Sequence, residues 1–160
     1  MVLNRILSIL RKEKPLAQNA IIDSIVVWKS RRIMQVYQGN KLLKTYAISL
    51  GKRPIGPKVQ EGDLRTPEGI YAINGRNPQS RFYRNLGISY PNQSDSENAA
   101  KLGKPPGGDI KIHGLRNGRG YRGKLHLLKD WTAGCIAVTN RQMDEIYQTV
   151  TPNALITIYP

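Results

Sequence analysis

Residues 32–49, RIMQVYQGNKLLKTYAIS, predict two strands joined by a tight turn. Apolar, β-branched and aromatic residues are frequent in 32–38 and again in 41–49, as they are in strands of known proteins. Between the two segments stands Gly39-Asn40, and glycine in the first place of a two-residue loop is typical of a type II′ hairpin. The stretch therefore predicts an antiparallel hairpin and points to a β-rich fold.

Five further segments have the composition or the alternation of short strands. Residues 51–69, by contrast, carry four glycines and three prolines and show no apolar period. A long loop of this kind inside a compact domain is usually functional. The expected strands are residues 24–30, 69–73, 86–90, 109–113 and 154–159.

Two helices are expected at the periphery of this sheet. Residues 94–103 predict a short helix that Ser94 or Asp95 would open and Gly103 would close. Residues 140–150 predict a second, amphipathic helix that begins with a capping box and repeats apolar residues at helical spacing. The chain is therefore expected to be mainly β with peripheral helices. The residues that cap or bury the second helix are Thr139, Gln142, Met143, Ile146, Tyr147 and Val150.

The composition describes one packed domain with a large positive charge. A chain of 160 residues can bury a core, and a hydrophobic content of 39% excludes a disordered protein. One cysteine excludes an internal disulfide, and with two histidines it is too few for a structural zinc site, so we expect no metal and no cofactor. The formal charge of +14 predicts attraction to nucleic acid, an anionic membrane face or an acidic polymer of the cell envelope, although it also serves solubility. The cations are scattered, which argues against a nucleic-acid-binding arm.

Residues 1–22 are expected to form a basic amphipathic segment ahead of a domain that spans residues 23–160. Arg5 interrupts its apolar run, which is too short for the core of a signal peptide, and no small-residue cleavage site follows. The segment is compatible with binding at a membrane surface, but a helix packed on its own domain is the favoured interpretation. No stretch is long enough to predict a transmembrane span. The apolar residues at helical spacing are Leu3, Ile6, Leu7 and Leu10.

The only cysteine, Cys135, follows the flexible Thr-Ala-Gly step of residues 132–134, at the end of a glycine-rich stretch expected to be a loop. A cysteine nucleophile attacks as the thiolate and needs a base, most often an imidazole. The candidates are His113, which ends an expected strand just before Gly114, and His126, which stands among leucines. Because strand ends and loops carry most functional sites, we favour His113 as the base and expect His126 to pack structurally.

The backbone around the cysteine also suits acyl transfer. The N–H groups of Gly134 and Cys135 are candidates for an oxyanion hole, since amides aimed at a developing negative charge stabilise it. Glycine lets the backbone approach a substrate closely. A lone cysteine is nevertheless among the most frequently buried residue types. From Cys135 and His113 alone, a structural role is as well supported as a catalytic one.

Four motifs, in order along the chain, resemble the L,D-transpeptidase catalytic domain, also called the YkuD family. They are RTPEGIY at 65–71, ISYPN at 88–92, KIHG at 111–114 and TAGCIAV at 132–138. The resemblance extends from the first expected strand to the last. It implies an L,D-transpeptidase-like β-sandwich of mixed sheets over residues 23–160.

The resemblance also implies a reaction on peptidoglycan stem peptides and sensitivity to carbapenem-type inhibitors. Cys135 would attack the carbonyl of the diamino acid, with His113 as general base and the Gly114 carbonyl orienting its ring. D-Ala would leave, and an amine would resolve the thioester; water as the acceptor would make the protein a hydrolase. The family is exported, which places the protein in the cell envelope or periplasm, with no nucleic-acid partner. The oligomeric state stays undefined.

The sequence departs from the commonest family pattern at Ala133 and Ala137. Many relatives carry a second histidine at the first position and an arginine or asparagine at the second. The version DWTAGC, residues 130–135, resembles a subset that includes a murein hydrolase, so transfer and hydrolysis both stay open. A non-catalytic basic module that binds polyanions is the third alternative. The candidate substrate-binding residues are Thr132, Arg65, Tyr90, Trp131, Arg116 and Lys129.

Overall fold

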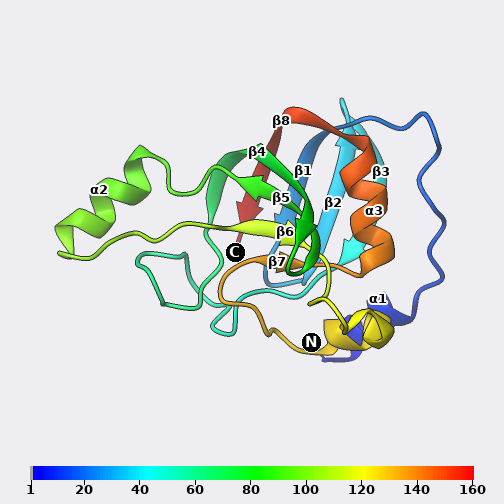
Figure 1. The fold of residues 1–160 in the computed structure, drawn as a ribbon, viewed down its shortest axis with the longest axis horizontal. Coiled ribbons are helices and arrows are strands. Elements are labelled where there is room, and N and C mark those ends of the chain that lie inside the picture. Colours follow the sequence, from blue (N-terminus) through cyan, green and yellow to red (C-terminus); the bar gives the residue numbers. More distant parts are fainter. Residues whose placement is uncertain (1) are drawn as a thin grey trace.

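The computed structural model describes residues 2–160, which fold around a curled, mixed sheet (Figure 1). The strands are β1 Ile22–Trp28, β2 Ile33–Gln38, β3 Lys41–Ala47, β4 Gly69–Ser80, β5 Tyr83–Ile88, β6 Lys111–His113, β7 Ile136–Ala137 and β8 Val150–Tyr159. Their order in the sheet is β3-β2-β1-β8-β4-β5-β6-β7. The helices are α1 Val2–Leu10, α2 Gln93–Lys101, the 3₁₀ segment η1 Gly120–Leu128 and α3 Asn140–Thr149. The expected fold class, mainly β with peripheral helices, is confirmed.

The hairpin predicted from residues 32–49 is present as β2 and β3. Gln38 faces Lys41 across the two-residue loop. Gly39 has a φ of +56°, whereas Asn40 does not adopt a positive φ, which is the pattern of a type II′ turn. β1 extends the hairpin on one side and pairs in parallel with the last strand, β8, so the two ends of the domain are joined at the centre of the sheet.

The sheet curls so that its two edges, at β3 and β7, meet beside the loop of residues 51–69. Ser49, just beyond β3, exchanges two backbone hydrogen bonds with Ala137 of β7, at 3.0 and 2.9 Å. Gly51 continues this contact alongside Thr132. The segment that carries Cys135 therefore lies against the start of the 51–69 loop. The core enclosed by the sheet includes Met34, Tyr46, Ile48, Ile112, Ile136 and Ile156.

The helices cap this core at its edges. In α3, Thr139 and Gln142 form the predicted capping box, and Met143 and Ile146 are buried. The prediction for α2 was wrong at its start, because Asn92 is the N-cap and Asp95 completes a capping box from inside the helix. The Asn92 side chain accepts a hydrogen bond from the backbone of residue 95 and so performs the task assigned to Ser94 or Asp95.

Several strand boundaries differ from the sequence prediction. β4 continues to Ser80 and β8 begins at Val150, so both strands are longer than residues 69–73 and 154–159 indicated. These extensions are largely polar, and backbone pairing rather than apolar alternation defines them. The stretch before Trp131, expected to be a loop throughout, contains η1.

Helix α1 packs on the domain, beside η1 at one end of the molecule (Figure 1). Ile9 is buried in a small cluster with Ala47 and Leu127. Of the expected segment 1–22, residue 1 lies outside the described residues. Within residues 2–160, no helix combines the length and the apolar character needed to cross a bilayer.

Candidate active site

The curled sheet brings Cys135 and His113 to one cavity of about 720 Å³. His113 ends β6 and pairs in register with Ala137 of the parallel strand β7. Cys135 stands two residues before Ala137, and side chains two apart along an extended chain project to the same face. This register is the local reason why two residues separated by a long loop share a cavity.

His113 is held as a neutral base. Its side chain is buried, and Nδ1 lies 2.7 Å from the carbonyl oxygen of Gly114. A carbonyl can only accept, so Nδ1 carries the proton and Nε2 keeps its lone pair. Burial lowers the pKa of His113 to about 4, and the hydrogen bond to Gly114 only partly opposes this. At neutral pH the imidazole is therefore uncharged and able to accept a proton.

Gly114 leaves no room for a side chain. An added Cβ would lie 2.6 Å from Oδ1 of Asn140 and 3.1 Å from Cβ of Tyr83. The same Asn140 oxygen accepts a hydrogen bond from the Leu115 N–H at 2.9 Å. These contacts fix the backbone carbonyl that accepts the hydrogen bond from His113 Nδ1.

The thiol of Cys135 is protonated in this arrangement. Sγ donates to the backbone carbonyl of Asp109 at 3.3 Å. Burial raises the pKa of the thiol, although the backbone N–H and the charge of Lys111 act in the opposite direction. A thiol in this state is a weak nucleophile until a base removes its proton. The site therefore presents a neutral thiol and a neutral imidazole.

The turn before the cysteine is held by Thr132. Its hydroxyl donates to the Cys135 carbonyl at 2.7 Å and accepts from the Gly134 N–H at 3.1 Å. Gly134 has a φ of +138°, and an added Cβ would lie 2.7 Å from the Arg65 carbonyl oxygen. Thr132 lines the cavity but its hydroxyl is engaged within the turn, so it shapes the turn rather than offering a free substrate-binding group. The Gly134 N–H is likewise engaged, which leaves the Cys135 N–H as the oxyanion-hole candidate.

The cavity has a cationic and aromatic lining. Trp131, Arg116 and Lys129, all expected at the site, belong to it. Sequence analysis missed three other cations and the aromatic ring of Phe82, whose centroid lies 4.6 Å from that of His113. The three arginines of the lining recur every third residue, a spacing that could have signalled a common surface. The missed lining residues are Lys52, Phe82, Leu115, Arg119, Arg122, Leu125 and Ala133.

Two expected substrate-binding residues lie outside this cavity. Tyr90 is buried in the core, where its hydroxyl donates to the Pro106 carbonyl at 2.8 Å and its ring meets Tyr71 edge-on. Arg65 contributes its backbone to the loop: its N–H donates to Asp63, and its carbonyl backs Gly134. Neither side chain is placed to contact a ligand in this cavity.

His126 supports the aromatic wall. Its Nδ1 accepts a hydrogen bond from the Trp131 indole N–H at 3.1 Å, and the Trp131 ring meets His113 edge-on. Burial lowers the pKa of His126 to about 4, with a further contribution from His113. The structural role expected for His126 is thus the one its contacts favour.

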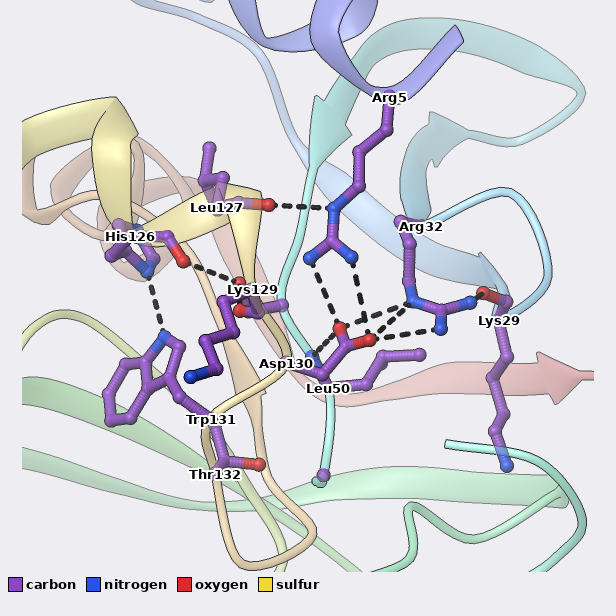
Figure 2. A network of polar contacts seen from close by, with 12 residues as sticks. Arg5, Lys29, Arg32, Leu50, His126, Leu127, Lys129, Asp130, Trp131 and Thr132 are labelled. Atoms are coloured by element: carbon purple, nitrogen blue, oxygen red, sulfur yellow. Dashed lines mark hydrogen bonds and ion pairs between the residues drawn. The ribbon is translucent and has the colours of Figure 1, made fainter. Parts of the chain in front are cut away.

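An ion-pair network anchors the segment that leads to the cysteine (Figure 2). The Asp130 carboxylate accepts from Arg5 of α1 at 3.2 Å, from Arg32 of the β1–β2 turn at 2.9 Å and from the Leu50 N–H at 3.1 Å. Burial alone would raise the pKa of Asp130, but the hydrogen bonds and charge of Arg32, with the charge of Arg5, lower it. Sequence analysis missed this carboxylate because its partners are distant in the chain.

Among residues 2–160, no three His, Cys, Asp or Glu side chains converge as a metal site requires. The family model of the L,D-transpeptidase catalytic domain, YkuD, matches residues 22–158. The chain belongs to this family. The Escherichia coli K12 protein named "Putative L,D-transpeptidase YafK" is 30% identical over 151 residues, which cover 85% of this chain and 53% of that protein.

Solved structures show the same architecture. The helical cell shape determining protein Pgp2 of Campylobacter jejuni has a TM-score of 0.66 and 26% identity, over 99% of this chain and 55% of that chain. Bd1075 of Bdellovibrio bacteriovorus has a TM-score of 0.61 and 22% identity, over 91% of this chain and 52% of that chain. The chain thus spans about half the length of the relatives that it matches.

Proposed function

We propose that this L,D-transpeptidase-family domain is a cysteine-dependent acyl transferase that acts on peptidoglycan stem peptides. The observation that carries the proposal is the state of His113, a neutral imidazole fixed by Gly114 that shares a cavity with the only thiol. Family membership and the likeness to YafK and Pgp2 support a cell-wall substrate and a location in the cell envelope.

In the first step, Nε2 of His113 takes the Sγ proton and the thiolate attacks the carbonyl of the diamino acid. The Cys135 N–H stabilises the oxyanion. As the intermediate collapses, the imidazolium returns its proton to the departing amine of D-Ala, and a thioester remains on Sγ. In the second step, an acceptor amine attacks the thioester and gives its proton to His113. The new peptide bond releases the thiol.

The cations of the cavity would meet the carboxylates of the stem peptides. Arg116 and Lys129 are exposed and line the cavity, as do the missed cations Lys52, Arg119 and Arg122. Trp131 would cover the bound peptide from the side of His126. A hydrolase would use the same first step and then water, in place of an amine, to attack the thioester. A non-catalytic polyanion-binding module would use neither step.

The test is intact-mass spectrometry of the protein incubated with imipenem, a carbapenem that acylates activated nucleophiles. We expect an adduct on the wild-type chain and none on Cys135→Ala, with both chains folded by circular dichroism. Absence of an adduct on the folded wild type, or an equal adduct on the variant, would contradict the proposed nucleophile.

The acceptor is tested separately with disaccharide-tetrapeptide and an excess of a free D-amino acid. Exchange of the terminal D-Ala would support transfer, whereas the tripeptide alone would assign the protein as a hydrolase. In both cases Cys135→Ser should lose turnover, because a hydroxyl is a much poorer nucleophile beside a neutral imidazole.

A further inference from the structure

The face of helix α1 that packs on the domain carries a charged side chain, Arg5. Arg5 donates through Nε to the Leu127 carbonyl at 2.8 Å and through Nη2 to Asp130 at 3.2 Å. Ile9 is the buried apolar residue of the helix. An amphipathic helix on a globular protein normally buries its apolar stripe. Helix α1 is unusual, because most of its apolar side chains lie on the face that points away from the domain.

That opposite face carries a stripe of leucines. Leu3, Leu7 and Leu10 are 67%, 58% and 73% exposed. Their spacing of i, i+4 and i+7 places them on one side of the helix, and Val2 beside them is also exposed. We call Leu3, Leu7 and Leu10 the leucine stripe. Contiguous exposed apolar side chains of this kind mark a surface that binds something.

The chain next to the leucine stripe presents only positive charge. Arg11, Lys12 and Lys14 follow α1 and are exposed. The acid among them, Glu13, turns inward and pairs with Lys124 at 3.1 Å, with a further hydrogen bond from Gln142 at 2.8 Å. The carboxylate is therefore neutralised by the domain, and the outward face of this segment is cationic.

Segment η1, which contacts α1, has the same character. Arg122 is exposed, as are Tyr121 at 79%, Leu125 at 70% and Arg119, the residue just before η1. Residues 110–129 contain no acid. Exposed apolar side chains among cations thus occur on both elements. The two elements lie side by side at one end of the molecule (Figure 1).

We propose that α1 and η1 together dock the domain onto an anionic phospholipid bilayer, with the leucine stripe inserted at the level of the headgroups. A bilayer offers both an apolar layer and negative charge, which is what interfacial helices with cationic flanks bind. A second copy of this chain fits less well, because each copy carries a formal charge of +14 and would present the same cations. Arg119, Arg122 and Leu125 also line the cavity of Cys135, so the proposed docking surface adjoins that cavity. The inference does not depend on the proposed catalysis.

The experiment is co-flotation of the full chain with vesicles of phosphatidylglycerol and phosphatidylcholine, compared with vesicles of phosphatidylcholine alone. We expect binding to the anionic vesicles, weakened by added salt. The triple variant Leu3→Ser, Leu7→Ser, Leu10→Ser should lose roughly tenfold in partitioning per leucine, the effect of withdrawing a buried leucine side chain. The matched control changes three exposed leucines elsewhere, Leu42, Leu102 and Leu155, to serine and should bind as the wild type does.

A second variant keeps the proposal testable if the leucine substitutions unfold α1. Changing Arg11, Lys12 and Lys14 to serine leaves the packed face of the helix intact and should weaken binding to anionic vesicles about tenfold or more. Equal binding by wild type and both triple variants would overturn the proposal. So would equal binding to neutral vesicles, retention on an anionic wall polymer but not on vesicles, or a dimer in light scattering that the leucine variant abolishes.

Discussion

The Asp130 network makes the strongest stability prediction, for the substitution Asp130→Asn. The carboxylate receives hydrogen bonds from two guanidinium groups and from the Leu50 N–H, and its side chain is 11% exposed. Asparagine keeps one acceptor oxygen but directs an amide donor towards one arginine. Breaking a fully buried ion pair costs about 3–5 kcal/mol, and a hydrogen bond to a charged group contributes about 1.5–3 kcal/mol. Because Arg5 and Arg32 remain 19% and 15% exposed, we expect the lower range.

The expected loss in free energy of unfolding is about 2–3 kcal/mol at pH 7, or a Tm lower by about 5–10 °C. It is measured by urea and thermal unfolding, with the exposed Glu97→Gln on α2 as the acid-to-amide control. Because the folded-state pKa of Asp130 lies below its ordinary value of 3.8, the stabilisation is fully present above that value and lost as pH falls through the lower pKa. A loss under about 0.5 kcal/mol, or a difference that persists unchanged at the lowest pH, would refute the assigned role.

Three other perturbations test the site. The rate of imipenem acylation should fall as pH drops through about 4, where His113 gains its proton. His126→Ala should show the same pH profile, and an inflection near 6.5 in the wild type would contradict a buried neutral base. Gly134→Ala should slow acylation by 100-fold or more, on the order of 3 kcal/mol in the barrier, because the new Cβ would lie 2.7 Å from a backbone carbonyl oxygen. Near-normal kinetics would show that the turn can shift. Lys29→Met should lower the free energy of unfolding in urea by about 3 kcal/mol, because the buried ammonium donates to Gly56, Thr66 and Glu68. An unchanged midpoint would contradict this anchoring of the 51–69 loop.

Local signals in the sequence were sufficient for the hairpin at 32–49 and the capping box of α3, and they also pointed to His113 and Cys135, which the fold brings to one cavity. Each depends on residues close in the chain or on a short family motif. Of the cations that line the cavity, Arg116 and Lys129 were predicted, whereas Lys52 was not, because it reaches the cavity from a separate loop. The burial of Tyr90 in the core was not foreseen, because a motif resembling the family shows which residues recur, but not whether a tyrosine faces the core.

The orientation of α1 was also beyond sequence analysis. Periodicity places leucines on one face of the helix, and an amphipathic helix packed on a domain normally buries its apolar face. The helix packs on its own domain as expected, but through Arg5 and Ile9, because Asp130, far along the chain, lies where Arg5 can reach it. A pairing between distant charges leaves no local pattern, so only the folded chain shows which face of α1 is turned inward.

The hydrogen bond from Cys135 to Asp109 has a consequence for chemical resilience. Peroxide and electrophiles attack thiolates, and a thiol kept protonated by burial is consumed far more slowly. The resting protein should therefore survive in an oxidising compartment without a reductant to restore its cysteine. The sequence has no second cysteine to capture a sulfenic acid as an internal disulfide, so the slow oxidation of the resting thiol limits this damage at its first step.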